Sequence, residues 1–285
     1  MAQIPHLSEE RHSLLDIRVQ TCWFDHCFQG RAVLPAVEAL QVLARSVLAS
    51  IPKAWVWDMQ DVHFEKFLVL QPGDESIQAL VKMHPWEQGG IVCTLLTKQW
   101  LPALRCSRLQ EHARVIFAPL MQACIPDLGK FIQTSLDDCS VPAAKIYTEL
   151  VPFCQAYHNI IGPVAMDGQA ARAQVFAAKH RTHTEPLGSP FPLDAALHAA
   201  CVWGQRYVGI VGFPVGFGRR VVFLQTHKGQ DYSAHMVSKK KGSRDFTVDI
   251  LLADAQGRPV EVLNDVVMRD VSGGRLTPPA WICAA

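Results

Sequence analysis

The spacing of apolar residues predicts one long helix in each half of the chain. In the first half, apolar side chains recur at intervals of three, four and seven within residues 34–50, a pattern typical of a helix that is buried on one face. Pro35 lies near the first turn of this helix and Pro52 lies just beyond its end, positions that favour a helix start and a helix stop. In the second half, Pro192 opens another apolar segment, which we expect to be helical to about Tyr207.

Shorter apolar runs around these helices predict antiparallel strands. Turns that contain glycine or proline separate the runs, as they do in β-hairpins. The expected strands are residues 13–19, 62–68, 77–83, 91–97 and 112–117 in the first half, and 173–178, 220–224, 246–252 and 260–269 in the second. The same order of elements thus occurs twice, although no residue-level repeat relates the two halves.

This repeated order predicts an α+β protein with two similar units. In each unit an antiparallel sheet would wrap around one central helix, and the two units would form an internal pseudo-dimer whose sheets pair edge to edge. We expect the first unit over residues 1–125 and the second over residues 144–285. Residues 126–143, which contain proline, glycine and two adjacent aspartates, are expected to link them.

Composition and charge exclude several classes of function. The chain has 285 residues, of which 49% are hydrophobic and 19% are charged, and this balance is typical of a folded protein rather than a disordered one. Lysine and arginine number 27 against 26 acidic residues, so the net charge of +1 gives no electrostatic reason to expect nucleic acid or an anionic membrane as the main partner. No apolar run approaches the roughly 18 residues that a membrane span needs.

The cysteines and histidines give no sign of a metal site. The nine cysteines include no CxxC pair, and most of them lie in apolar surroundings, where a free thiol behaves as a small hydrophobic group. His180 and His183 stand three residues apart without further ligands, which is more typical of a solvated loop. The N-terminus is polar and lacks the apolar core of a signal peptide. We therefore expect a soluble, reduced, cytoplasmic protein without a bound metal.

The segment His26–Pro35, which reads H-C-F-Q-G-R-A-V-L-P, is the sharpest chemical signal in the chain. Composition predicts only about 0.05 chance occurrences of this HxxxGxxxxP pattern. A neutral imidazole at His26 can take up a proton near neutral pH. Gly30 lets a substrate approach its backbone N–H, and Pro35 starts a helix whose N-terminal dipole favours negative charge. The alternative is a histidine in a loop, with a glycine and a proline that only shape a turn.

Asp194 and His198 form a second motif, DxxxH, at the start of the second helix. A spacing of four places the two side chains on one helix face, one turn apart. The pattern is weak by itself, because the same spacing occurs elsewhere in the chain and because an aspartate that caps a helix N-terminus is common. Its position, directly after a Phe-Pro-Leu sequence and in the half that lacks HxxxGxxxxP, distinguishes it.

Together these motifs resemble those of the dehydratase domains of modular polyketide synthases and related fatty-acid synthases. The resemblance covers nearly the whole chain, since residues 213–221 look like the family's strand after the second helix and residues 253–269 look like its closing hairpin. It implies a double hotdog fold with a catalytic histidine from the first hotdog and an aspartate from the second. By this resemblance, His26 would be the base, Asp194 the acid, and Gly30 an N–H donor to the thioester carbonyl.

The resemblance also implies further substrate-binding residues, with one departure from the family pattern. The expected residues are Pro35, His198, Ile161 and Gly162. The family commonly shows GYxYGPxF, whereas residues 158–165 of this chain read H-N-I-I-G-P-V-A. The Gly-Pro pair is retained, but Ile161 replaces the tyrosine before it and offers no hydroxyl. This departure bears on substrate range, and we expect His198 to hold the catalytic acid in place of that tyrosine.

The predicted reaction is the elimination of water from a 3-hydroxyacyl thioester to give the 2,3-enoyl thioester. His26 would remove the weakly acidic α-proton while the Gly30 N–H and the helix dipole stabilise the enolate-like oxygen. Asp194, with its pKa raised by burial in an apolar tunnel, would donate a proton to the leaving hydroxide. The resemblance implies acyl carrier protein as the partner, with the substrate on its phosphopantetheine arm and no other cofactor; a homodimer stays open.

Two alternatives to a dehydratase stay open. A double-bond isomerase acting on enoyl thioesters could use the same acid and base with a different balance of protons. A non-catalytic module that binds acyl carrier protein, or that has a structural role, is favoured by the missing tyrosines.

Overall fold

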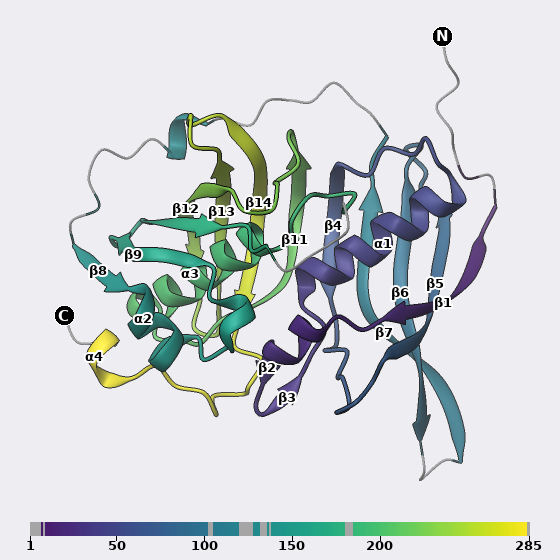
Figure 1. The fold of residues 1–285 in the computed structure, drawn as a ribbon, viewed down its shortest axis with the longest axis horizontal. Helices are drawn as coiled ribbons and strands as arrows, with labels where there is room; N and C mark the ends of the chain where they lie inside the picture. Colours follow the sequence, from purple (N-terminus) through teal and green to yellow (C-terminus); the bar gives the residue numbers. More distant parts are fainter. Residues whose placement is uncertain are drawn as a thin grey trace. The chain divides into compact units, whose positions relative to one another are not determined.

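The computed structural model describes residues 7, 9–101, 105–119, 128–131, 136, 138–179 and 185–283. The chain divides into two units, residues 1–122 and 123–285. Each unit contains one long helix and one antiparallel sheet (Figure 1).

The sheet of unit 1 has the strand order β1-β5-β6-β7-β4, and all neighbouring strands are antiparallel. Its strands are β1 (Arg11–Arg18), β4 (Asp58–Phe64), β5 (Ser76–Pro85), β6 (Ile91–Leu101) and β7 (Cys106–Phe117). The long helix α1 (Ala36–Ser50) packs against β5, β6 and β7 (Figure 1). A 3-10 turn, η1 (Thr21–Asp25), and two short strands, β2 (Cys27–Phe28) and β3 (Arg31–Ala32), lead from β1 into this helix.

Helix α1 begins where the prolines predict, but it is buried on more than one face. Pro35 occupies the N-cap, and its carbonyl accepts the N–H groups of Glu38 and Ala39. Every residue from Val37 to Ala44 is buried, including Glu38 and Gln41, which are 0% and 1% exposed. The expectation of a helix buried on one face is therefore wrong, because this is the central helix of its unit and is enclosed on the side of its polar residues as well.

The sheet of unit 2 has the strand order β11-β14-β13-β12-β10-β9-β8, again antiparallel throughout. Its strands are β8 (Cys139–Pro142), β9 (Ile160–Met166), β10 (Ala170–Phe176), β11 (Phe213–Val222), β12 (Asp231–Lys241), β13 (Asp245–Ala253) and β14 (Pro259–Arg269). The long helix α3 (Phe191–Tyr207) packs against β10, β12 and β13. The remaining short elements are η3 (Gly129–Phe131), α2 (Ala143–Lys145), the π-helical turn η4 (Ile146–Leu150), η5 (Gln155–Tyr157) and α4 (Ala280–Cys283).

The two sheets share one topology. In unit 1, β1 precedes the long helix, and β4, β5, β6 and β7 follow it along the chain. Across the sheet, β1 is followed by β5, β6 and β7, and β4 comes last. In unit 2, the same order starts from β10, and β9 and β8 extend the sheet at that edge. The repeat that the sequence predicts in the order of elements thus extends to the order of strands.

Several strands differ from the sequence-based expectation. Strand β4 ends at Phe64 rather than at residue 68, because Leu68 and the residues after it pair with the segment before α1. Strands β9 and β12 were not predicted, and β7 begins at Cys106 rather than at residue 112. The segment 126–143, expected as a linker, ends in β8, whose residues pair with β9.

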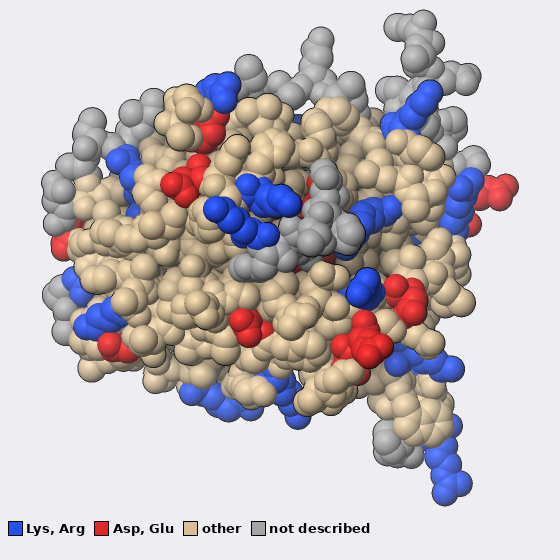
Figure 2. Space-filling view, viewed as in Figure 1, with Lys and Arg blue, Asp and Glu red and all other residues tan. Residues whose placement is uncertain are grey.

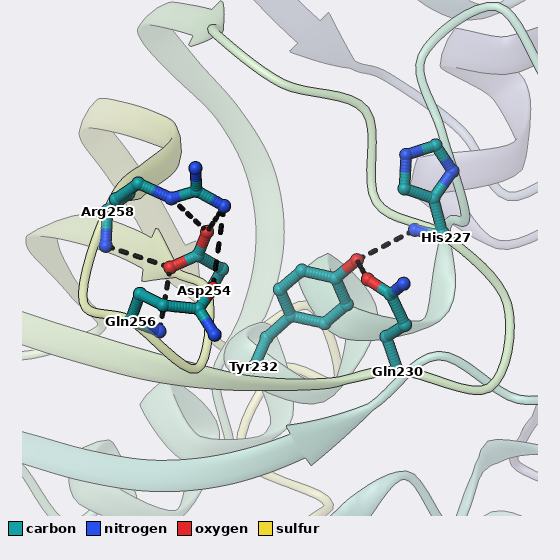
Figure 3. A network of polar contacts seen from close by, with 6 residues as sticks. All are labelled: His227, Gln230, Tyr232, Asp254, Gln256 and Arg258. Atoms are coloured by element: carbon teal, nitrogen blue, oxygen red, sulfur yellow. Dashed lines mark hydrogen bonds and ion pairs between the residues drawn. The ribbon is translucent and has the colours of Figure 1, made fainter.

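The hairpin that closes the chain turns at Asp254, as the sequence predicts. One oxygen of the Asp254 carboxylate accepts the backbone N–H groups of Gln256 and Arg258, and the other binds the Arg258 guanidinium (Figure 3). Near this turn, the hydroxyl of Tyr232 in β12 accepts the N–H of His227 and donates to the side chain of Gln230 (Figure 3). The carboxylate satisfies backbone groups that the tight turn would otherwise leave unpaired.

The surface charges, the helices and the cysteines of the described residues indicate no particular function. Acidic and basic side chains are interspersed on the face shown in Figure 2, without a large area of one sign. None of the helices within the described ranges has both the length and the hydropathy that crossing a membrane requires. None of the cysteines for which the structure gives a position forms a disulfide.

Candidate active site

The HxxxGxxxxP motif of unit 1 forms a two-residue β-hairpin that leads into α1. Strands β2 and β3 pair directly, and Gln29 and Gly30 form the turn between them. Both turn residues have positive φ, +49° and +75°, which is the requirement of a type I′ hairpin turn and explains the glycine locally. A Cβ atom on Gly30 would meet nothing within 4 Å, so the space in front of this residue is open.

His26 lies at the base of this hairpin, with its backbone held on both sides. Its N–H donates to the carbonyl of Trp23 (3.1 Å), and its carbonyl accepts the N–H of Val33 (2.9 Å). Trp23 is only 1% exposed and anchors the turn before the hairpin. The neighbouring thiol of Cys27 donates to the Phe24 carbonyl (3.2 Å). The imidazole of His26 therefore projects from a fixed backbone position.

Asp194 lies in the first turn of α3 but does not cap the helix. Its N–H donates to the Pro190 carbonyl (3.1 Å), so its backbone already belongs to the helical ladder. The N-cap is Pro190, which has no side-chain capping bond. The interpretation of Asp194 as the N-cap residue is therefore wrong, because Pro190 occupies that position.

His198 contacts Asp194 directly, as a spacing of four on a helix predicts. Its Nε2 lies 3.1 Å from Oδ2 of Asp194, and each side chain is only 6% exposed. Nδ1 of His198 has no hydrogen-bond partner in the part of the chain that the structure describes. A buried carboxyl and a buried imidazole in contact, neither of them used for capping, are the groups of unit 2 best suited to proton transfer.

Aromatic side chains surround His198 within unit 2. The ring of Tyr147 meets the imidazole edge-on, with centroids 5.9 Å apart and planes at 82°, and the ring of Phe153 lies at 5.0 Å. Burial raises the pKa of the Tyr147 hydroxyl, and the negative charge of Asp194 acts in the same direction, against the N–H groups of Ile160 and Asn159. Sequence reasoning missed Tyr147 and Phe153, because a single tyrosine or phenylalanine in a short helical segment carries no motif.

Ile161 and Gly162 lie in β9, at an irregularity of the strand. The pairing of β9 with β10 shifts between Arg172 and Gln174, and Gly162 in the bulged segment has φ +73°. Ile161 is 43% exposed whereas Ile160 is 4% exposed, so the side chain at 161 lies on the opposite face from its buried neighbour. The Gly-Pro pair thus has a local structural role here, and substrate binding by Ile161 and Gly162 stays a prediction. His180 and His183 lie outside the described residues.

Comparison with known proteins gives the fold. No family model and no curated protein matches the sequence. A trans-AT polyketide synthase dehydratase domain from Brevibacillus brevis matches with a TM-score of 0.72 and 19% identity, over 94% of this chain and 96% of that one. The dehydratase domain of the CurJ module of curacin polyketide synthase matches with a TM-score of 0.70 and 18% identity, over 92% and 93% of the two chains. The chain has the fold of polyketide synthase dehydratase domains.

A further structure with this dehydratase fold is a CurJ variant. It is an inactive mutant, with phenylalanine in place of a histidine, in complex with a small compound, and it matches with a TM-score of 0.69 and 17% identity over 92% of each chain. In the dehydratase fold of the present chain, His26 belongs to unit 1, whereas Asp194 and His198 belong to unit 2. The predicted fold family is confirmed, since these dehydratase domains have the double hotdog fold; the wrapping of each sheet around its helix and the internal pseudo-dimer stay predictions.

Proposed function

We propose that the chain is a dehydratase that converts a 3-hydroxyacyl thioester to the 2,3-enoyl thioester and water. The observation that carries the proposal is the buried contact between Asp194 and His198 on α3, in a chain with the fold of polyketide synthase dehydratase domains. His26 is the base and Asp194 is the acid. Because each comes from a different unit, we also propose that the two units form the internal pseudo-dimer of a double hotdog, each sheet wrapping its own helix.

The first proton transfer belongs to His26. The imidazole takes the α-proton, and the electron pair of the C–H bond forms the new double bond as the carbon–oxygen bond at C3 breaks. Negative charge that develops on the thioester oxygen is stabilised by the N–H of Gly30 and by the N-terminal end of α1. The glycine supports this role, since it has no side chain to obstruct a thioester oxygen that approaches its N–H.

The second proton transfer belongs to Asp194. Hydroxide is a poor leaving group, so the protonated carboxyl donates its proton to the departing oxygen, which leaves as water. His198 holds this carboxyl from one helical turn away. At the end of the reaction His26 carries one additional proton and Asp194 has lost one, and a proton transfer between them or through water restores the resting state.

The partner in this proposal is acyl carrier protein, which presents the substrate on a phosphopantetheine arm. No other cofactor is needed, because one acid and one base supply both proton transfers. The CurJ dehydratase supports an essential histidine in this fold, since its histidine-to-phenylalanine variant is inactive.

Product analysis tests the proposal and separates its rivals. The purified protein is incubated with 3-hydroxyacyl, 2,3-enoyl and 3,4-enoyl thioesters, and the products are identified by mass spectrometry and NMR. Loss of water from the hydroxyacyl thioester is expected, and His26→Ala should lower its rate at least ~10²-fold with an unchanged melting temperature. Migration of a double bond without loss of water would instead indicate an isomerase. A folded protein that converts none of the three would indicate a non-catalytic module.

A further inference from the structure

Tyr147 is held rigidly beside the Asp194–His198 pair. It lies in the π-helical turn η4 and is 7% exposed. Its ring stacks on His158, with centroids 4.2 Å apart and planes at 15°, and meets the imidazole of His198 edge-on. The turn is tied to α3, because the side chain of Gln205 donates to the Leu150 carbonyl (2.9 Å). The helix that carries the acid thus also fixes the position of this tyrosine.

The oxygen of the Tyr147 hydroxyl accepts two hydrogen bonds, whereas its hydrogen is not donated to any of the described residues. It accepts the backbone N–H groups of Asn159 (3.0 Å) and Ile160 (2.9 Å). A phenolic hydroxyl has one hydrogen to donate, and both hydrogen bonds that Tyr147 makes with the described residues are accepted ones. Two accepted hydrogen bonds polarise the O–H group and make it a stronger donor. A buried donor of this kind without an acceptor is costly, so it points to a ligand.

Tyr147 and Asp194 both lie against His198, since the Tyr147 ring meets the imidazole edge-on at 5.9 Å and the Asp194 carboxyl lies 3.1 Å from Nε2. Burial raises the pKa of Tyr147, so the hydroxyl keeps its hydrogen at neutral pH. A ligand oxygen that accepts from Tyr147 while it receives a proton from Asp194 would satisfy both groups. In a 3-hydroxyacyl thioester, the oxygen that fits this description is the 3-hydroxyl.

We propose that Tyr147 recognises the 3-hydroxyl group of the substrate by donating its hydroxyl hydrogen to that oxygen. The inference rests on the proposed dehydratase function and names the residue that selects hydroxylated acyl chains over saturated ones. A site built to hydrogen-bond a substrate hydroxyl discriminates strongly against the analogue that lacks it. Since this hydroxyl is neutral and rigidly held, it contributes to substrate binding and orientation. The two proton transfers of the reaction are still carried out by His26 and Asp194.

The test compares two ligands that differ only in the hydroxyl. Dissociation constants for the 3-hydroxybutyryl and butyryl thioesters of N-acetylcysteamine are measured by calorimetry in the Asp194→Asn background, which prevents turnover. Tyr147→Phe keeps the ring contacts and removes the donor, so it should reduce the preference for the hydroxylated ligand by about tenfold. Butyryl binding should be unchanged. An unchanged preference, or equal weakening of both ligands, would overturn the proposal.

Tyr232→Phe is the matched control. It also removes a hydroxyl of unit 2 that accepts a backbone N–H, but this hydroxyl already donates its hydrogen to the side chain of Gln230 (Figure 3). Its ligand preference should equal that of the parent. If Tyr147→Phe does not fold, 3-fluorotyrosine at position 147 replaces it: this stronger donor should increase the preference, and an unchanged preference would contradict the proposal. Wild-type turnover is assayed separately, because hydroxyl preference without enoyl product would contradict the dehydratase function and leave hydroxyl recognition standing.

Discussion

At the scale of single residues, the contact between His198 and Asp194 has a direct consequence for turnover. The imidazole lies 3.1 Å from the carboxyl in a buried site. We expect this contact to tighten into an orienting hydrogen bond when substrate binds, and one such bond is worth about 1–2 kcal/mol. His198→Ala should therefore lower kcat for a 3-hydroxyacyl thioester by roughly tenfold, while His198→Gln should retain more of the activity. Steady-state kinetics on folded variants check this, and a kcat of His198→Ala equal to the wild type would exclude the orienting role.

Ile161→Tyr, alone and combined with His198→Ala, tests whether the side chain at position 161 faces Asp194. From the sequence, a tyrosine at this position would reach the catalytic acid, but Ile161 is 43% exposed and lies opposite to its buried neighbour. We expect Ile161→Tyr to leave kcat within about twofold of its parent and not to rescue His198→Ala, since substitutions at residues that share no contact combine additively. Recovery of activity in the double variant would show that position 161 faces the acid after all.

The residues of the site differ in how far the sequence could predict them. Asp194 and His198 share a helix face because a spacing of four fixes that geometry for any helix. The position of Ile161 depends on a bulge in β9, which shifts the strand register and which no local pattern signals. Tyr147 was missed for a similar reason. It lies in a π-helical turn, and its hydroxyl contacts Asn159 and Ile160, which are far from it in sequence, so no local pattern signals the contact.

At the scale of elements, the packing of α3 on β13 depends on a glycine inside the helix. A Cβ atom at Gly204 would come closer to the ring of Phe246 than real Cβ atoms approach any neighbour. Alanine is the better helix former by about 1 kcal/mol, yet overpacking a filled core costs about 1–3 kcal/mol. Gly204→Ala should therefore destabilise the protein by about 1–2 kcal/mol in denaturant unfolding.

Phe246→Leu provides the control for this packing effect. The smaller side chain leaves a cavity and is itself destabilising, by roughly 1 kcal/mol or more. In its background, Gly204→Ala should be neutral or stabilising, because the added methyl group then has space. Equal destabilisation in both backgrounds would show that the ring of Phe246 is not what requires the glycine.

The long helices were predicted more accurately than the strands. Proline at the helix starts and dense apolar spacing identify α1 and α3 to within a few residues. Strand β12 alternates correctly, with Tyr232, Ala234 and Met236 buried, but its small and polar residues and its lysine-rich end hide the pattern. Strand β4 ends early because long-range pairing of Leu68 with the segment before α1 overrides the local preference.

At the scale of the whole molecule, the two units have the same strand order, and each carries one of the two sequence motifs. His26 lies at the base of a hairpin in unit 1, and Asp194 is buried on the central helix of unit 2. The sequence predicts the repeated order of elements because helix and strand periodicities are local. It does not predict the order of strands within each sheet, which depends on contacts between residues far apart in the chain.

A double-mutant cycle on the dehydration rate tests the central claim most directly. His26→Ala, Asp194→Asn and the double variant are compared with the wild type in conversion of a 3-hydroxyacyl thioester, after melting temperatures have shown that all four are folded. Each single change should lower kcat by at least ~10²-fold, and the double variant should lose little more than the worse single variant, because an acid and a base that serve one elimination act as a unit. Wild-type turnover in either folded single variant, or losses that simply multiply in the double variant, would contradict a reaction shared by His26 and Asp194.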